Sequence, residues 1–395
     1  MNLDELNANW NYPTNIRHGI GRISELAAAC KELGMQAPLL VTDPGLAALP
    51  MIQQAIDSCA KAGLFCGLFS QVKSNPSSDN VTDGVLAYKK GQHDGVIAFG
   101  GGSALDAAKA VALMVGQELP LWDFEDAGDN WKRVNTQKMA PVVAVPTTSG
   151  TGSEVGRASV ITDEQQHVKR LIFHPNMLPS IVILDPELTV GLPPHLTAAT
   201  GMDAFSHALE AYCSPYYHPM AEGIALEAIR LIKNYLPRAV AVGSDLEARA
   251  QVMVSSTMGA TAFQRGLGGM HALAHSLGAL YDSHHGLLNA LLMPYIVKAN
   301  RSKIETRIER LSRYLELQDS SFDGFVNWIV ALRTELGIPH SLAEIGIDTA
   351  QVEKIGQMAV NDLAASGNPI QFTEQQYSNI CLAAVNGNLL SVTSY

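Results

Sequence analysis

The first half of this 395-residue chain alternates short apolar runs with stretches of helical periodicity. Runs that are apolar throughout indicate strands buried on both faces, and their alternation with helices predicts a parallel sheet covered by helices on both sides. The predicted strands are 37–42, 95–99, 141–145 and 181–184, and the predicted helices between them include 51–62 and 104–115.

Strand signals fade after about residue 193, and long helical stretches follow. They include 199–211, 220–235 and 246–263, and they come after a cluster of Pro186, Gly191, Pro193 and Pro194. A chain of this length is too long for a single compact core. We therefore expect an α/β N-terminal Rossmann-like domain with a parallel sheet over residues 1–190, which binds a dinucleotide. An all-α, metal-binding C-terminal domain is expected over residues 191–395.

The composition excludes several classes of protein. Hydrophobic residues make up 47% and charged residues 16% of the chain, as in a well-buried globular enzyme and unlike a disordered or repeat protein. The formal net charge of -11 argues against nucleic acid or an anionic membrane as a partner, because both require a basic face. Five cysteines without a CxxC pair indicate reduced thiols in a cytoplasmic protein.

Two further patterns support this expectation. No run of 18 apolar residues is present, so no membrane span is predicted. The first seven residues include the acidic Asp4 and Glu5, where a signal peptide would need positive charge and an apolar run.

Two histidine-bearing stretches have the spacing of metal ligands. Asp203 and His207 are four residues apart and would project from one face of a helix, and a second stretch contains His271, His275 and the pair His284–His285. Such polar residues inside otherwise apolar helices need a partner, since burying them alone is costly. One carboxylate oxygen and several imidazole nitrogens without a thiolate suit Fe(II) or Zn(II).

Two glycine-rich loops follow predicted strands. Gly100–Ser103 opens a predicted helix, where backbone N–H groups and the helix dipole attract a pyrophosphate. The run is not the GxGxxG fingerprint, and a glycine run after a strand is as often only a tight turn. The second loop, 146–153, is rich in hydroxyl side chains, and two such loops at strand ends fit the place where open α/β sheets bind ligands.

Asp43 ends the first predicted strand and leaves two interpretations open. Its carboxylate can accept a hydrogen bond from a ribose 2'-hydroxyl and would repel a 2'-phosphate, which favours NAD over NADP. It can equally cap the turn that Pro44 and Gly45 begin.

With these motifs, nearly the whole sequence resembles the iron-dependent (group III) alcohol dehydrogenases, which share their dehydroquinate-synthase-like architecture with glycerol dehydrogenase. The motifs that carry the resemblance are Val41-Thr-Asp43, Asn75-Pro76, Gly100-Gly-Gly-Ser-Ala-Leu-Asp106-Ala-Ala-Lys109, Pro146-Thr-Thr-Ser-Gly-Thr-Gly-Ser-Glu154-Val155, Thr200-Gly-Met-Asp203-Ala-Phe-Ser-His207-Ala-Leu-Glu210, Gly266-Leu-Gly-Gly-Met-His271-Ala-Leu-Ala-His275, His285-Gly-Leu-Leu-Asn289 and Gly337-Ile-Pro339.

The resemblance implies a role for individual residues. The metal ligands would be Asp203, His207, His271 and His285, forming one mononuclear site between the domains, with His275 as a catalytic residue that lines the site without ligating. The cofactors would be NAD and Fe(2+), with Zn(2+) as the alternative metal. The nucleotide would be bound by Asp43, Asn75, Gly101, Gly102, Ser103, Asp106, Thr147, Thr148 and Lys169.

We therefore expect an NAD-dependent alcohol dehydrogenase that interconverts a small primary alcohol, or a hydroxy acid, with its aldehyde by hydride transfer. A homodimer or higher homo-oligomer is also expected. Three rivals remain: a dehydroquinate-synthase-like lyase, a hydroxyacid–oxoacid transhydrogenase and a non-catalytic scaffold, the last disfavoured by the intact ligand positions.

The substrate stays open because the sequence departs from the family pattern at Arg157, Arg265 and His284. An arginine can bind a substrate carboxylate, although a surface salt bridge is the better explanation of each arginine.

Overall fold

The computed structural model describes residues 12–166 and 168–395, which form two compact units, Tyr12–Gly191 and Leu192–Tyr395. Residues 1–11, where the sequence predicts no signal peptide, lie outside the described residues. Each unit is described by itself below.

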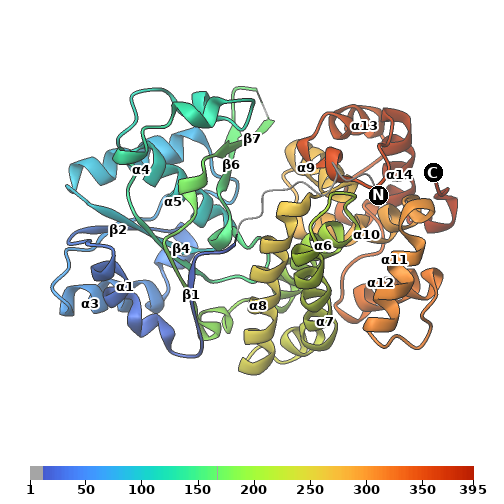
Figure 1. Cartoon of the computed structure of the whole chain (residues 1–395), viewed down its shortest axis with the longest axis horizontal. Helices are drawn as coiled ribbons and strands as arrows, with labels where there is room; N and C mark the ends of the chain where they lie inside the picture. The colour runs from blue at the N-terminus through green and yellow to red at the C-terminus, as the bar shows by residue number, and fades with distance from the viewer. Residues whose placement is uncertain (1–11, 167) are drawn as a thin grey trace. The chain divides into compact units, whose positions relative to one another are not determined.

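The first unit is built on a six-stranded, fully parallel sheet with the order β1-β8-β5-β4-β2-β3 (Figure 1). Its strands are β1 (Asn15–His18), β2 (Pro38–Val41), β3 (Gly67–Phe69), β4 (Gly95–Gly100), β5 (Val142–Pro146) and β8 (Ile181–Leu184). The four strands predicted from apolar runs are all present, and their sheet is parallel. Two short strands at its edges, β1 and β3, had no such signal because they are partly exposed.

Helices cover both faces of this sheet, as expected for continuous apolar strands. Helices α1 (Leu26–Glu32) and α3 (Pro50–Lys61) pack on one face, and α4 (Ser78–Lys90) and α5 (Gly102–Met114) lie on the other (Figure 1). A short helix, α2 (Pro44–Ala47), follows β2, and an antiparallel hairpin of β6 (Ala158–Asp163) and β7 (Val168–Phe173) packs beside α5.

The strand order places a topological switch point between β2 and β4. The chain passes from β2 to β3 on one side and then to β4 on the other side of β2. Connections that leave in opposite directions open a crevice at the carboxyl ends of the two strands, which is where doubly wound sheets bind their ligands. Asp43 and the loop at Gly101 follow those two strand ends.

The second unit is a helical bundle in the described residues. Its helices are α6 (Pro194–Cys213), α7 (Pro219–Ala241), α8 (Leu246–Ala262), α9 (Gly269–Tyr281), α10 (His285–Ala299), α11 (Arg301–Tyr314), α12 (Phe322–Glu335), α13 (Val352–Val360) and α14 (Glu374–Val385). A parallel sheet with a helical second half confirms the predicted fold class. Within the described residues, no helix has both the length and the apolar character that a membrane crossing needs.

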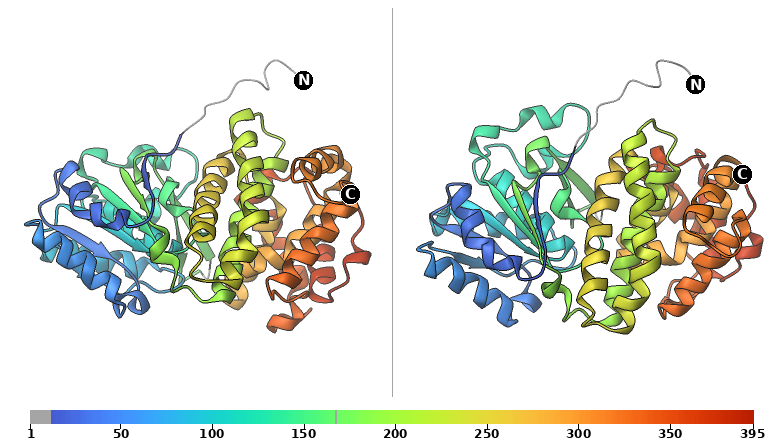
Figure 2. Two further views of the ribbon diagram at one scale, coloured as in Figure 1. Left: turned by 90° about the horizontal axis from the view of Figure 1, so that it is seen from below. Right: turned by 60° about the horizontal axis from the view of Figure 1, so that its bottom comes forward.

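Helix α6 lies at the centre of this unit. It packs against α7, α8 and α10, and α6–α8 run side by side in the views of Figure 2. Every residue from Gly201 to Cys213 is buried, so polar side chains on this helix are held away from water.

A glycine allows α8 to approach α6 closely. A Cβ added at Gly259 would lie 2.9 Å from the carbonyl oxygen of Ala204 and 3.4 Å from the Cβ of His207. The neighbouring atom at the shorter distance is backbone, so it cannot move aside by rotating a side chain.

Replacing Gly259 with Ala should therefore destabilise the helical unit. Overpacking costs about 1–3 kcal/mol, offset by about 1 kcal/mol of gained helix propensity, so we expect a net loss of up to about 2 kcal/mol in the free energy of unfolding. Gly223→Ala is the matched control, because a Cβ at this exposed position in α7 meets nothing within 4 Å and should stabilise slightly. Equal midpoints of urea unfolding for the two variants would contradict the close contact.

Candidate active site

Three of the four predicted metal ligands converge in the core of the helical unit. Asp203 and His207 project from one face of α6, and His271 comes from the first turn of α9. One carboxylate oxygen and one imidazole nitrogen from each of the histidines lie within 4.8 Å of one another, and all three side chains are buried. The four-residue spacing that suggested a shared helix face corresponds to this arrangement.

The fourth predicted ligand, His285, begins α10 beside them. Its Nε2 lies 3.7 Å from Oδ1 of Asp203, and its ring centroid is 5.3 Å from that of His271. Asn289, one turn later on α10, donates from Nδ2 to Oδ1 of Asp203 at 2.8 Å. The structure thus brings all four predicted ligands together, on side chains that belong to the helical unit.

This group of side chains fits a divalent cation. Nδ1 of His207 is buried and has no hydrogen-bond partner among the described residues, a costly state for an imidazole nitrogen unless something occupies it. Three imidazole nitrogens and one carboxylate oxygen are the donors that Fe(II) and Zn(II) accept. The residues present therefore match the expected metal.

The electrostatics favour cation binding. Burial opposes the ionised form of Asp203, but the charges of His207, His285 and His271 outweigh it and lower its pKa to about 2. Burial, followed by the charge of His207, lowers the pKa of His271 well below its usual value. A carboxylate anion and a neutral imidazole are the states in which these groups ligate a metal.

His275, the predicted catalytic residue, lies next to two of the predicted ligand histidines. Its ring stacks on that of His285 with centroids 5.2 Å apart. Its Nδ1 is 3.0 Å from Oδ2 of Asp362, whose other oxygen accepts the backbone N–H of Ala364. Burial would raise the pKa of Asp362, but the charge and hydrogen bond of His275 lower it instead.

Asp362 escaped the sequence analysis because it lies 87 residues from His275. Its local pattern is that of a helix cap, so only the fold brings its carboxylate to the histidine. Phe263 also lines this region, with its ring centroid 5.1 Å from that of His207.

The predicted phosphate cradle lies at the carboxyl ends of β4 and β5. Gly101 is the N-cap of α5 and Gly102 its first residue, so the backbone N–H groups at this helix end are available as orphan donors. A Cβ at Gly102 would come within 2.5 Å of Thr151, which explains the glycine at this position. The backbone N–H of Thr147 donates to Gly100 at 2.9 Å and joins the two loops. A Cβ at Gly101 would contact Thr148 at 3.4 Å.

Asp43 caps helix α2. Its Oδ1 accepts the backbone N–H of Leu46 at 2.9 Å, so the capping role left open by the sequence is present. The cap does not exclude a role at the ribose, because a carboxylate has about four acceptor positions.

The remaining predicted nucleotide residues form pairs inside the same unit. Nζ of Lys169 donates to Oδ1 of Asn75 at 2.9 Å across 94 residues, and Oγ of Ser103 donates to the carbonyl of Ser74. The first bond links the β6–β7 hairpin to the loop that follows β3, and the second links the same loop to the start of α5.

Asp106 has both carboxylate oxygens engaged within the protein. It accepts from Oγ of Ser153 and, at 2.9 Å, from the backbone N–H of Val160. The buried Lys109, 3.3 Å away, donates to the carbonyl of Ser153 at 3.0 Å. Asp106 therefore holds the second loop and the hairpin against α5, and through them the shape of the cradle.

Comparison with known proteins covers both units of the chain. Residues 13–186 match the family described as iron-containing alcohol dehydrogenase, and residues 197–385 match the Fe-containing alcohol dehydrogenase family, C-terminal. The chain belongs to the iron-containing alcohol dehydrogenase family. The resemblance seen in the sequence motifs is confirmed.

Three relatives illustrate the range of this family. A 4-hydroxybutyrate dehydrogenase of Cupriavidus necator is 37% identical over 376 residues, which cover 93% of this chain and 97% of the relative. The crystal structure of a 1,3-propanediol oxidoreductase has a TM-score of 0.91 at 34% identity, covering 95% of this chain and 100% of that one. A sulfoacetaldehyde reductase from Bifidobacterium kashiwanohense, solved in complex with NAD+, has a TM-score of 0.87 at 28% identity over 96% and 99% of the two chains.

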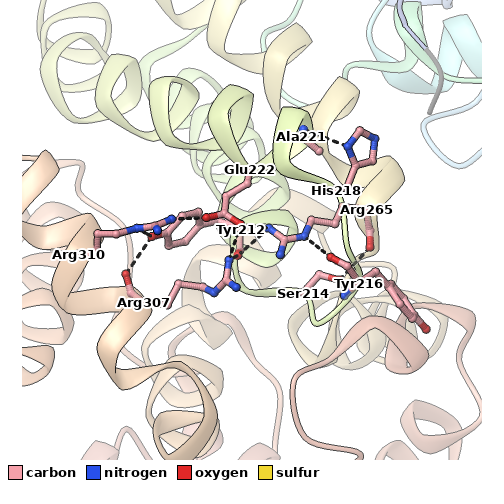
Figure 3. A network of polar contacts seen from close by, with 9 residues as sticks. All are labelled: Tyr212, Ser214, Tyr216, His218, Ala221, Glu222, Arg265, Arg307 and Arg310. Carbon is pink, nitrogen blue, oxygen red and sulfur yellow. Dashed lines mark hydrogen bonds and ion pairs between the residues drawn. The ribbon is translucent and has the colours of Figure 1, made fainter. Parts of the chain in front are cut away.

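In this iron-containing alcohol dehydrogenase, Arg265 is an internal structural residue. It is 4% exposed, which overturns the expectation of a surface salt bridge. Its Nε donates to the carbonyl of Tyr216 at 2.7 Å, and its Nη1 lies 3.2 Å from the carbonyl of Tyr212 and 3.1 Å from Oε2 of Glu222 (Figure 3). Its Nε and Nη1 are thus engaged by the end of α6, by the connection to α7 and by the first turn of α7.

Two more arginines share this network. Arg307 and Arg310 also pair with Glu222, and their guanidinium groups lie 5.4 and 5.7 Å from the ring centroid of Tyr212 (Figure 3). Arg157, the other candidate anion contact, lies in the α/β unit with its guanidinium 5.6 Å from the ring centroid of Phe173.

Replacing Arg265 with Ala should lower stability without changing substrate choice. The carbonyl of Tyr216 would lose a charge-assisted bond and a cavity would form, so we expect about 2–4 kcal/mol off the free energy of unfolding. The KM for a hydroxy acid and for propanol should change by the same factor. Arg230→Ala is the control, because this surface arginine pairs with Glu227 and should cost at most about 1 kcal/mol. A rise in KM confined to the hydroxy acid would contradict this structural role and indicate that Arg265 contacts the substrate carboxylate.

Proposed function

We propose that this iron-containing alcohol dehydrogenase interconverts a small primary alcohol and its aldehyde with NAD, using a metal held by Asp203, His207, His271 and His285. The observation that carries the proposal is the buried convergence of Asp203, His207 and His271, with Nε2 of His285 3.7 Å from Oδ1 of Asp203. Nδ1 of His207 has no protein partner among the described residues. Membership of the family supplies the reaction class.

When bound, the metal supplies a Lewis acid that polarises the alcohol or carbonyl oxygen, and the nicotinamide ring accepts or donates the hydride. The chain's own residues do the rest. Phe263 provides an apolar surface beside His207. Such a surface excludes water, and electrostatic interactions are stronger where water is excluded. His275 moves the hydroxyl proton at Nε2, while Asp362 holds the ring through Nδ1.

The nucleotide is proposed to bind at the switch point of the parallel sheet. The N-terminus of α5 at Gly101 and Gly102 would take the pyrophosphate, and Asp43 the adenosine ribose. Ser103, Thr147, Thr148, Asn75 and Lys169 would surround it, with Asp106 holding their loop. This proposal makes residues 1–190 the dinucleotide-binding domain and residues 191–395 the metal-binding domain.

The relatives narrow the substrate class. 4-Hydroxybutyrate, 1,3-propanediol and the alcohol related to sulfoacetaldehyde are short primary alcohols with a polar group at the far end. We propose a substrate of this kind, a hydroxy acid included. Because Arg265 is bonded internally, an anionic group would have to be recognised by other residues.

We also propose that the enzyme is cytoplasmic and forms a homodimer or higher homo-oligomer. The support for the first is the state of the cysteines: Cys30, Cys59, Cys66, Cys213 and Cys381 are all free thiols, as in proteins of reducing compartments. The support for the homo-oligomeric state is the family resemblance of the sequence.

The reaction and the metal site can be tested together. The metal-loaded enzyme should form NADH stoichiometrically from 1,3-propanediol or 4-hydroxybutyrate. His271→Ala should lose both the metal and at least 100-fold in kcat/KM while keeping its far-ultraviolet circular dichroism, because a ligand has been removed. His195→Ala is the control, an exposed histidine in the first turn of α6 outside the cluster.

Three outcomes would contradict this proposal. Full metal occupancy in His271→Ala would contradict the assignment of His271 as a metal ligand. Turnover without net NADH, or hydride exchange between a hydroxy acid and an oxo acid without added NAD, would favour the lyase or the transhydrogenase.

Cofactor choice gives a separate prediction. The unaltered enzyme should prefer NADH to NADPH, and Asp43→Gly should raise kcat/KM for NADPH relative to NADH at least tenfold, because the charge that repels a 2'-phosphate is gone. Glycine is tolerated at an N-cap at a cost of a few tenths of a kcal/mol, so α2 should stay folded. Asp43→Asn keeps the cap without the charge and should relax the preference as well. Equal use of both cofactors by the unaltered enzyme would remove Asp43 from the ribose site.

A further inference from the structure

Glu210 is a buried carboxylate on the same face of α6 as two proposed metal ligands. It follows Asp203 by seven residues and His207 by three, so the three side chains align along the helix. The site described above uses Asp203 and His207 directly and leaves Glu210 without a role.

Both oxygens of Glu210 are bonded to the start of α9. Oε2 accepts the backbone N–H of Gly268 at 2.7 Å and lies 2.6 Å from Nδ1 of His271, and Oε1 accepts the backbone N–H of Met270 at 2.7 Å. The intervening N–H, that of Gly269, donates to Oδ1 of Asn368 at 3.0 Å. The orphan donors at this helix N-terminus are therefore satisfied largely by one side chain from α6.

This arrangement holds the backbone and the ring of His271 together. Its two oxygens accept the backbone N–H groups of Gly268 and Met270, so Glu210 anchors the first turn of α9. Its bond to Nδ1 places the imidazole proton on that nitrogen and leaves the lone pair on Nε2. Without the carboxylate, the ring could carry its proton on either nitrogen, and only one of the two tautomers can ligate through Nε2.

We propose that Glu210 is a positioning residue for the metal site, which fixes the tautomer and orientation of His271 and thereby sets the metal affinity. The inference rests on the proposed function, in which His271 is a ligand. It differs from a purely structural role, in which Glu210 would only dock α9 on α6 and its loss would affect stability alone.

Glu210→Gln is the variant that separates the two roles. Gln keeps the size of Glu, but its NH2 group must face at least one donor, either the backbone N–H of Met270 or Nδ1–H of His271. Loss of a carboxylate partner of a ligating histidine typically costs 10–100-fold in metal affinity. The dissociation constant for Zn(II), measured by chelator competition on the full-length protein, should rise by this factor.

Glu222→Gln is the matched control. Glu222 is a carboxylate of the same unit, paired with Arg265, Arg307 and Arg310 and not with a ligand. This control should lower the melting temperature of the metal-free protein and leave the Zn(II) dissociation constant unchanged. In Glu210→Gln the rise in melting temperature on adding zinc chloride should shrink, because that rise follows the affinity.

The outcomes are distinct. An unchanged Zn(II) dissociation constant in folded Glu210→Gln and Glu210→Leu proteins overturns the positioning role, because leucine leaves Nδ1 of His271 without an acceptor, while loss of zinc in His271→Ala keeps the ligand assignment. Failure of the unaltered protein to bind zinc or Fe(II) overturns the proposed function itself. If Glu210→Gln does not fold, Glu210→Asp keeps the charge but cannot span both bonds. A weakened Zn(II) affinity in that variant supports the inference, and an unchanged affinity overturns it.

Discussion

The structure depends on how the helical unit tolerates a buried carboxylate and two buried imidazoles in its core. Asp203, His207 and His271 are buried, and an isolated charge or unpaired imidazole there would cost several kcal/mol. Attraction between the Asp203 carboxylate and the neighbouring histidines offsets this cost, as do the hydrogen bond that the Asn289 amide donates to Asp203 and the bond between Glu210 and His271. Nδ1 of His207 is buried and has no protein partner among the described residues.

The α/β unit also contains a charged pair, Lys109 and Asp106, beside the predicted phosphate cradle. Lys109 is buried in α5 and bonds Asp106 together with backbone carbonyls of the second loop and of β6. Neither residue is at a strand end, yet together they determine where the hydroxyl-rich loop lies relative to Gly101. A rigid scaffold of this kind keeps backbone donors in place before the ligand arrives, which lowers the entropy cost of binding.

Most of the fold could be predicted from the chain, and the failures have a physical explanation. The central strands are apolar on both faces, so their periodicity was unambiguous, whereas β1, β3 and the β6–β7 hairpin are short or partly exposed. Arg265 was expected at the surface because charged residues are mostly exposed. It is buried because the carbonyls of Tyr212 and Tyr216 and the carboxylate of Glu222 satisfy its guanidinium group.

The sequence by itself determined the residue types, the helical spacing of Asp203 with His207 and of His271 with His275, and the glycines at the start of α5. These signals lie within a few residues of one another, so local periodicity and backbone conformation are enough to reveal them. Only the tertiary structure decided which distant groups complete the site. Asp362 meets His275 across 87 residues and Glu210 meets His271 across 61. Such contacts follow from helix packing, which no local pattern encodes, because one carboxylate on an apolar helix looks the same whether it ligates, caps or orients a neighbour.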